Sequence, residues 1–424
     1  MTTPTRLERD LPGILDDLSA APTYEYLDDV FARTARMRQR PAWTFPERWL
    51  PMANITRPRA FAFAPPLRTI AVALVVIALL LAAVAVYVGS HQQRVPEPFG
   101  PARNGLIPYE SSGDIYVGDP ATGASRLVVG GADDDHDPGF SPDGALIAFI
   151  RSPNTMDADL YTVRPDGTDL KRVTTVPIPS DSWVNWTPDS KHFAVIHKVN
   201  GHSQLDMLDM SGQARRLAAD IAVTELTFRP PLAPEILFRG VKDGHIGLFA
   251  MNADGTNIRT LITSPRPGNS DLEYIGATYS ADGTRIFYQS WTPAGYQGEE
   301  GCCQLWVMDA NGSNPHQFVH DAVNAWEGLP AVSPDGQWVA FWRVVDTTRV
   351  AVVRADGSGP VTQIGPNLTG TASWTWAPDS SKILMVPSDP AESPRQYLLD
   401  PAGGPWTTAA WQATSNPDWQ RLAP

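Results

Sequence analysis

The chain has 424 residues, which exceeds what one small hydrophobic core can organise and suits one large domain with appended segments. Its 40 prolines and 33 glycines, with only 19% charged residues, indicate many turns joined by short strands. The formal charge of −13 is carried by the part beyond residue 88, where acidic residues outnumber basic ones. Such a field repels phosphates, so no nucleic-acid partner is expected for this part.

Residues 1–68 are expected to form a cytoplasmic helical tail. Two stretches, "TRLERDLPGILDDLSA" and "PTYEYLDDVFARTARMRQR", place apolar side chains on one helical face. Aromatic residues and prolines follow in "RPAWTFPERWLPM". Either these aromatic residues dock the tail at a membrane surface, or the two helices capture a cytoplasmic partner.

Residues 69–88, "TIAVALVVIALLLAAVAVYV", are uncharged and numerous enough to cross the hydrocarbon core of a bilayer as one helix. A cleavable signal peptide would lie nearer the N-terminus, and a buried core helix is the alternative. Arginines flank this segment, with three just before it and two after it. This bias favours a cytoplasmic tail and an acidic part outside. Residues 89–104 contain prolines and are predicted to be an extended linker.

Residues 105–424 repeat two short patterns about every 45 residues. The first is a Ser-Pro-Asp-Gly-type turn before an apolar strand, as in "GFSPDGALIAFIRS" and "AVSPDGQWVAFWR". The second is an apolar strand that ends in an Asp-Gly-type turn, whose glycines are Gly123, Gly167, Gly212, Gly255, Gly312, Gly357 and Gly403. Periods of this length with four short strands per unit predict the blades of an all-β propeller.

Each repeat is predicted to run from strand a through the Pro-Asp-Gly turn to strands b and c, and through the Asp-Gly turn to strand d. Seven copies of the second pattern predict seven blades. The first copy lacks strand a, and the chain ends on an unpaired "SNPDWQRLAP". The last strand should therefore complete the first blade and close the ring, which removes two sheet edges. The a–b and c–d turns then share one face, called here the turn face, and the other connections share the opposite loop face.

These repeats resemble the TolB-like β-propeller family, in which the same two turns recur in the same order. The resemblance covers roughly residues 105–424 and implies a propeller that leaves function open. Because the family's namesake is periplasmic and six-bladed, six blades remain an alternative. The tail looks like those of bacterial membrane proteins of the anti-sigma type, which implies a sigma factor as partner. The zinc-binding His and Cys pattern common in anti-sigma domains is absent here.

Local catalytic motifs are missing from the sequence, including the metalloprotease, nucleophile-elbow, P-loop and dinucleotide-binding patterns. We therefore expect no catalysis and no cofactor, with a propeller-based enzyme as the alternative. The acidic stretch "GADDDHDPG" offers oxygen ligands for calcium but does not match EF-hand spacing, so no metal site is expected. Adjacent Cys302 and Cys303 are predicted to form a disulfide in an oxidising compartment, with free thiols or a bond between chains as alternatives.

Ligand binding is expected on the loop face, because variable loops on a rigid scaffold usually carry it. The longest repeat places two surplus loops there, "TSPRPGNSDLEY" and "SWTPAGYQGEEGCC". The candidate ligand-binding residues lie in these loops or near the starts of a strands: Asp137, Trp183, Glu225, Tyr274, Tyr296, Cys302, Cys303, Trp326 and Trp374. Some of the aromatic residues among them would instead pack in the core.

The sequence thus predicts a single-pass bacterial envelope protein whose extracytoplasmic propeller binds a protein or another envelope ligand. A regulator of the anti-sigma type and a propeller enzyme are the alternatives. If Gly105 begins strand b of the first blade, the linker enters on the turn face, beside Gly167 and Gly255. The loop face would then point away from the membrane.

Overall fold

The computed structural model of the chain describes residues 71–81, 95–153, 156–231, 235–264, 274–290, 303–320, 325–389, 395–413 and 416–423. The chain divides into two compact units, Met1–Ala85 and Val86–Pro424. In the first unit residues 71–81 are helical, whereas the predicted tail lies outside the described ranges. No helix in the described ranges is long and apolar enough to cross a membrane, so the predicted span over 69–88 is not shown.

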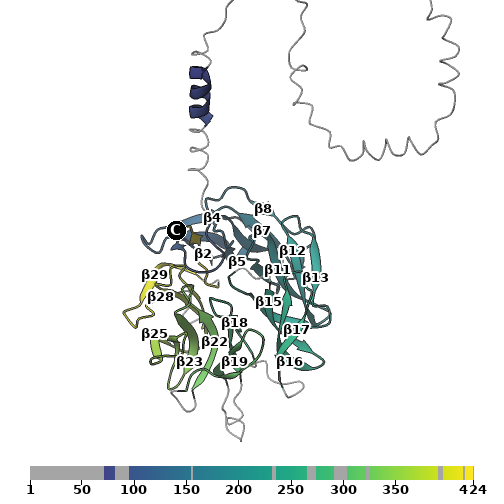
Figure 1. Cartoon of the computed structure of the whole chain (residues 1–424), viewed down its shortest axis with the longest axis vertical. Coiled ribbons are helices and arrows are strands. Elements are labelled where there is room, and N and C mark those ends of the chain that lie inside the picture. Colours follow the sequence, from purple (N-terminus) through teal and green to yellow (C-terminus); the bar gives the residue numbers. More distant parts are fainter. Residues whose placement is uncertain are drawn as a thin grey trace, which may run out of the picture. The chain divides into compact units, whose positions relative to one another are not determined.

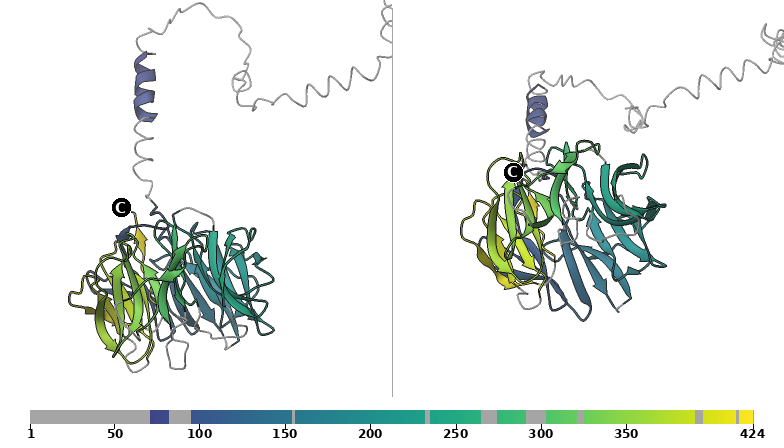
Figure 2. Two further views of the ribbon diagram at one scale, coloured as in Figure 1. Left: turned by 60° about the horizontal axis from the view of Figure 1, so that its bottom comes forward. Right: turned by 90° about the horizontal axis from the view of Figure 1, so that it is seen from below.

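The second unit is an all-β propeller of seven blades. Its antiparallel sheets succeed one another around a ring in chain order, so the yellow end of the chain lies beside its blue beginning (Figures 1 and 2). Each blade corresponds to one sequence repeat. Within a blade the strands pair in chain order, from strand a (strand b in blade 1) to the last strand. The predicted count of seven blades is therefore confirmed, and the alternative of six is wrong.

The strands of the blades have the following bounds. Blades 1 to 3 consist of β2 (Ile107–Ser111), β3 (Asp114–Gly118) and β4 (Ser125–Val129); β5 (Asp134–Phe140), β6 (Ile147–Ser152), β7 (Asp157–Val163) and β8 (Lys171–Arg172), with β9 (Ile178–Pro179) also paired to β7; and β10 (Trp183–Trp186), β11 (His192–Val199), β12 (His202–Asp209) and β13 (Ala214–Leu217).

Blades 4 to 7 consist of β14 (Ala222–Phe228), β15 (Glu235–Lys242), β16 (His245–Asn252) and β17 (Arg259–Thr263); β18 (Thr278–Tyr279), β19 (Arg285–Ser290), β20 (Gln304–Asp309) and β21 (His316–Gln317); β22 (Trp326–Val332), β23 (Trp338–Val344), β24 (Thr348–Arg354) and β25 (Thr362–Leu368); and β26 (Ala372–Trp376), β27 (Ile383–Pro387), β28 (Arg395–Leu399) and β29 (Thr407–Gln412).

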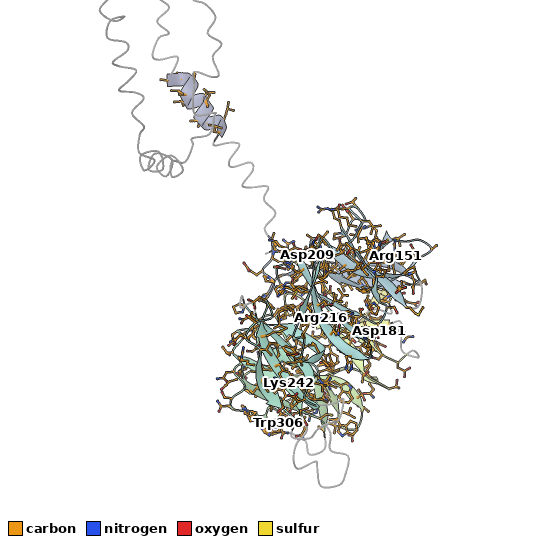
Figure 3. The ribbon with its side chains drawn as sticks, turned by 90° about the vertical axis from the view of Figure 1, so that its right-hand side faces the viewer. Arg151, Asp181, Asp209, Arg216, Lys242 and Trp306 are labelled. Carbon is orange, nitrogen blue, oxygen red and sulfur yellow. The ribbon has the colours of Figure 1, made fainter. Side chains whose placement is uncertain are left out.

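The hydrophobic core lies between the blades. Among the described residues, buried apolar side chains form seven clusters, and each cluster joins two neighbouring sheets. Large aromatic residues of the b strands are fully buried there, including Phe149, Phe238 and Phe341. Some charged pairs lie on the outer strands, as for Arg216 on β13 (labelled in Figure 3), whose Nε is 2.5 Å from Oδ1 of Asp206 on β12. Sheets that pack face to face in this way need apolar residues on both faces of the inner strands.

The Ser-Pro-Asp-Gly-type turns connect neighbouring blades on the turn face. In blade 2 the Ser141 hydroxyl donates to the Asp143 carboxylate at 2.5 Å and so fixes the turn. The Asp143 N–H then donates to Ser190 Oγ in the corresponding turn of blade 3, at 3.1 Å. In the same way the Asp335 N–H of blade 6 donates to Ser380 Oγ of blade 7, at 3.0 Å. The repeated motif therefore serves both the hairpin and the contact between blades.

The C-terminal segment pairs with the residues that lead into the first blade. β30 (Arg421–Leu422) pairs with β1 (Arg103–Asn104), and the Gly105 N–H donates to the Gln420 carbonyl at 3.0 Å. The C-terminus accordingly lies beside β2 (Figure 1). Trp419 is only 5% exposed and packs in the cluster between blades 7 and 1. These contacts confirm the predicted closure of the ring by the last strand.

Replacing Trp419 by alanine should therefore weaken the closed ring. Loss of this buried side chain leaves a cavity at the junction, and we expect the free energy of unfolding to fall by about 3 to 5 kcal/mol. Urea unfolding followed by far-ultraviolet circular dichroism measures it. Trp406→Ala is the matched control, because Trp406 is 42% exposed and its loss should cost only about 0.5 kcal/mol. Equal losses for the two variants would contradict the closure.

Candidate functional site

The linker reaches the propeller on the turn face. The Gln420 side-chain amide donates to the carbonyl of Gly144, in the a–b turn of blade 2, at 2.7 Å, and Gly105 is bonded to the same glutamine. Arg421 holds the preceding linker residues by donating to the carbonyls of Glu97 at 3.0 Å and Gly100 at 2.5 Å. The chain thus enters blade 1 from the face that carries the hairpin turns, as the strand order predicted.

The described linker residues also lie across the turn-face end of the central channel. A cavity of about 180 Å³ is bounded by Phe99 and Arg421 together with Pro230 of blade 4, Ala281 of blade 5 and Pro334 of blade 6. Residues of blades 1, 4, 5 and 6 meet in this way only near the axis of the ring. The linker therefore covers this end of the channel.

A cavity of about 610 Å³ is lined by residues of blades 2, 3 and 7 and by residues 416–418 of the C-terminal segment. It brings together three of the predicted residues, namely Asp137 of β5, Trp183 of β10 and Trp374 of β26. Trp183 is 54% exposed, which is high for an indole side chain on an inner strand. This size and this mixture of aromatic and polar groups are typical of sites for small ligands. We therefore take this channel cavity as the candidate functional site.

Asp137 reaches the cavity because of a β-bulge. The pairing of β5 with β6 shifts register between His136 and Gly139, and Asp137 adopts a left-handed φ of 50°. Aspartate tolerates this conformation better than most residues. Its carboxylate lies 3.1 Å from the His136 ring nitrogen Nδ1, and this hydrogen bond raises the pKa of His136. The bulge re-aims one acidic side chain toward the channel, as bulges beside binding sites often do.

Asp418 is the acidic residue of the cavity that the candidate set did not include. It lies three residues before β30, and its Oδ2 accepts the Phe140 N–H at 2.5 Å. The carboxylate borders the cavity but is otherwise surrounded by protein, and burial raises the pKa of Asp418 despite this hydrogen bond. Asn185, Ser373 and Asn416 supply further polar groups to the lining. The C-terminal segment was predicted to form strand a of blade 1. That prediction was the sequence signal from which Asp418 could have been named as a site residue.

The structure places three other predicted residues away from the cavity. Tyr274 is 3% exposed and packs against Tyr288 with ring centroids 5.8 Å apart, so it belongs to the core. The Oε2 atom of Glu225 accepts the Gly276 N–H at 2.8 Å, and burial raises the pKa of this carboxyl. Glu225 therefore joins blade 4 to the segment before β18. Trp326 begins β22 and is 38% exposed, but it does not border the channel cavity.

The predicted loop residues are described only in part. Cys303 is disulfide-bonded, is 3% exposed and accepts the Glu327 N–H on its carbonyl at 2.6 Å. The chain has one other cysteine, Cys302, which lies outside the described residues together with Tyr296. A disulfide at Cys303 agrees with the predicted pairing. Cys303 itself is a buried anchor for the start of β20 and does not line the cavity.

The acidic stretch before blade 2 is used within the fold. Asp135 is 1% exposed and accepts two hydrogen bonds from Arg151, at 2.6 and 2.8 Å. Asp133 lies 3.5 Å from the same guanidinium. Such bidentate pairs satisfy the carboxylate in a buried site. Within the described ranges, no three His, Cys, Asp or Glu side chains are grouped closely enough to hold a metal ion.

A second groove of about 680 Å³ lies on the turn face between blades 3 and 4. Phe99, Met207 and Phe228 give it an apolar floor. Its acidic side chains already serve the turns: Asp189, for example, accepts from the Lys191 N–H at 2.9 Å and lies 3.0 Å from the His192 ring. Because linker residues Pro98 and Phe99 form part of its wall, we regard this groove as a packing surface of the linker.

Comparisons with known proteins place the fold. No protein-family model matches the chain. A curated but uncharacterized protein of Agrobacterium fabrum is 24% identical over 270 residues, which are 61% of this chain and 71% of that protein. TolB from Acinetobacter baumannii is similar with 16% identity and a TM-score of 0.46, over 74% of this chain and 81% of that one.

Two enzymes are also similar in structure. An oligogalacturonate lyase from Vibrio parahaemolyticus has 9% identity and a TM-score of 0.52, over 74% of this chain and 85% of that one. The periplasmic gluconolactonase of Pseudomonas aeruginosa has 13% identity and a TM-score of 0.51, over 75% of this chain and 98% of that one. At these identities the likeness is one of fold alone. The chain is thus a seven-bladed β-propeller.

The expectation that the chain is not an enzyme is corrected by these comparisons. Two proteins that share its fold are a lyase and a gluconolactonase, so a propeller of this kind can be an enzyme. The missing sequence motifs exclude only the chemistries that need those motifs. Fold and motif absence together therefore do not decide whether this chain catalyses a reaction.

The raised pKa of Asp418 predicts a specific pH dependence. Since its carboxyl titrates higher in the folded than in the unfolded chain, the ionised group costs stability above the folded pKa. Asp418→Asn keeps a carbonyl acceptor for the Phe140 N–H without the charge. We expect wild type to gain stability relative to this variant as pH falls from 7 through the raised pKa. Urea unfolding at pH 7.5 and pH 4.5 measures the free energies of unfolding of both proteins. A wild type that is less stable relative to the variant at pH 4.5 than at pH 7.5 would contradict the prediction.

Proposed function

We propose that the chain is a membrane-anchored, extracytoplasmic propeller that binds an envelope ligand, a small molecule or an exposed group of a protein, in the channel cavity. The observation that supports it most directly is the meeting of Asp137, Trp183, Trp374 and Asp418 around one cavity, from blades 2, 3 and 7 and the C-terminal segment. Four side chains far apart in sequence converge there.

The exposure of Trp183 gives this proposal its energetic argument. An indole that is 54% exposed leaves much apolar surface in water, and a ligand that covers it recovers roughly 25 cal/mol for each Å² buried. Partly covered tryptophans in concave sites are often the residues that contribute most to binding. A ligand in the channel cavity would contact Trp183 and the polar groups of the lining at the same time.

The anchoring part of the proposal rests on the apolar segment 69–88 and on the point where the linker enters. The described linker begins at Val95 and crosses the turn face, so only residues 89–94 separate it from that segment. Six residues span at most about 20 Å when extended. The turn face would therefore face the bilayer, and the loop face would be open to a ligand from the envelope.

A capture experiment tests ligand binding. Full-length protein in detergent is immobilised and incubated with an envelope extract, and retained compounds are identified by mass spectrometry. We expect wild type and Trp406→Ala to retain the same compound, and Trp183→Ala/Trp374→Ala to lose at least about 90% of it because the aromatic surfaces are gone. Retention that does not depend on these two tryptophans would contradict a site in the channel.

Anchoring and topology are tested by fractionation. The full chain should stay in the membrane pellet after alkaline carbonate washing, and a variant lacking residues 69–88 should be released, because about twenty apolar residues hold the helix in the bilayer. Protease added to intact spheroplasts should digest the propeller and leave an N-terminal epitope protected. Digestion of the N-terminal epitope instead would reverse the topology.

A regulator of the anti-sigma type is the second candidate, and one contact favours it. Arg421 of β30 follows Asp418 of the cavity by three residues and donates to the linker carbonyls of Glu97 and Gly100. A ligand that moves Asp418 would thereby act on the segment that continues toward the membrane. Co-purification of a sigma factor that requires residues 1–68 would support this candidate.

A further inference from the structure

We infer that the channel cavity takes a compact organic cation, a quaternary or protonated amine, held between tryptophan rings and carboxylates. This inference rests on the proposed function and names the chemical class of its ligand. Three features of the described residues carry it: the charges that line the cavity, the acidic residues that have no arginine partner, and the position of the indole rings.

The lining of the channel cavity is negative. Its charged side chains are Asp137 and Asp418, and no lysine, arginine or histidine side chain borders it among the described residues. Two basic groups lie near these carboxylates, His136 beside Asp137 and Arg421 near Asp418, and each also has other partners. His136 lies between Asp137 and the Ser152 hydroxyl, with its Nε2 2.9 Å from Ser152 Oγ. Arg421 donates to two linker carbonyls on the turn face.

Other acidic residues near the starts of the a strands have an arginine directly across the strand pair. Asp135 pairs with Arg151 in blade 2, where the shortest N–O distance is 2.6 Å. Glu225 faces Arg239 in blade 4, and Glu327 faces Arg343 in blade 6 with atoms 3.7 Å apart. The fold thus neutralises the acidic residues that it buries at these positions.

Asp137 and Asp418 do not follow this rule. Neither forms an ion pair with an arginine within the described ranges, although both border a protein-lined cavity. An ionised carboxylate at the buried Asp418 is costly unless a positive charge compensates it. The Asp137 side chain is 53% exposed and is paired with His136, so it adds negative charge at the open side of the cavity. A bound cation supplies that charge, whereas a neutral ligand leaves it uncompensated and an anion is repelled.

The tryptophans complete a site for a cation. Trp183 and Trp374 come from blades 3 and 7, whereas Asp137 comes from blade 2 and Asp418 from the C-terminal segment. Trp186 also borders the cavity, and its Nε1–H donates to the Gly139 carbonyl at 3.2 Å, which fixes the ring. Indole is the best aromatic partner for an ammonium group, because its ring face is electron-rich. A cavity of about 610 Å³ accommodates a ligand of modest size around that group.

A pair of isosteric probes separates charge from shape. Choline carries a quaternary ammonium group, and 3,3-dimethylbutan-1-ol has nearly the same shape without the charge. Each is titrated into the full-length protein in detergent, with binding measured by tryptophan fluorescence and by calorimetry. We expect choline to bind at least about tenfold more tightly than the alcohol, which corresponds to about 1.4 kcal/mol.

Two substitutions assign the effect to the site. Asp137→Asn/Asp418→Asn keeps the shape of the side chains and should reduce the preference for choline to less than about threefold. Trp183→Leu should weaken the binding of choline more than that of the alcohol, because it removes the ring and keeps an apolar side chain. Trp406→Ala lies outside the cavity and should bind both probes as wild type does.

The outcomes distinguish this inference from the proposed function. Equal binding of the two probes, or no binding of choline at millimolar concentration, overturns the cationic class. If the capture experiment meanwhile retains a neutral or anionic compound that depends on Trp183 and Trp374, the proposed binding function stands. Binding of choline that is unchanged in both cavity variants also overturns the inference, because the cation then binds elsewhere.

Discussion

The closure of the ring by one short strand is the interaction on which the rest of the structure depends. Asp418, Trp419, Gln420 and Arg421 are consecutive, and each makes a different connection. Asp418 borders the cavity, Trp419 fills the junction of blades 7 and 1, Gln420 bonds to blade 2, and Arg421 holds the linker. Without this strand the first sheet would expose an edge in the channel. Stability, binding and the attachment of the linker are thus joined in four residues.

Sequence patterns were sufficient for the fold because the blade turns are local structures. The Asp143 and Asp335 turns specify their hairpins with side-chain bonds that span only two residues. Counting those turns therefore counts blades, and the unpaired C-terminal segment can be assigned to the first blade. The N-terminal segment over 69–88 remains a prediction, because hydropathy alone indicates a membrane span there.

The site was harder to predict, because it depends on departures from regular strand geometry. Strict alternation along β5 would not indicate that Asp135 pairs with Arg151 while Asp137 borders the channel. The bulge after His136 makes this difference, and bulges have weak sequence signals. Tyr274 shows the converse. It has the position and residue type of a site residue, yet a left-handed turn with φ of 62° directs it into the core.

The channel cavity also shows why catalysis and binding cannot be separated by fold. A carboxyl whose pKa is raised by burial suits a general acid, and it equally suits a site that gains a compensating cation. What distinguishes the two is a second titratable group within reach of the same atom. Within the described lining the second titratable group is Asp137, which lies at the bulge of β5 in blade 2. The outer strands of each blade support the inner strands. Substitutions at the cavity-facing positions of β5, β10, β26 and the C-terminal segment can therefore change the chemistry of the channel while the ring is preserved.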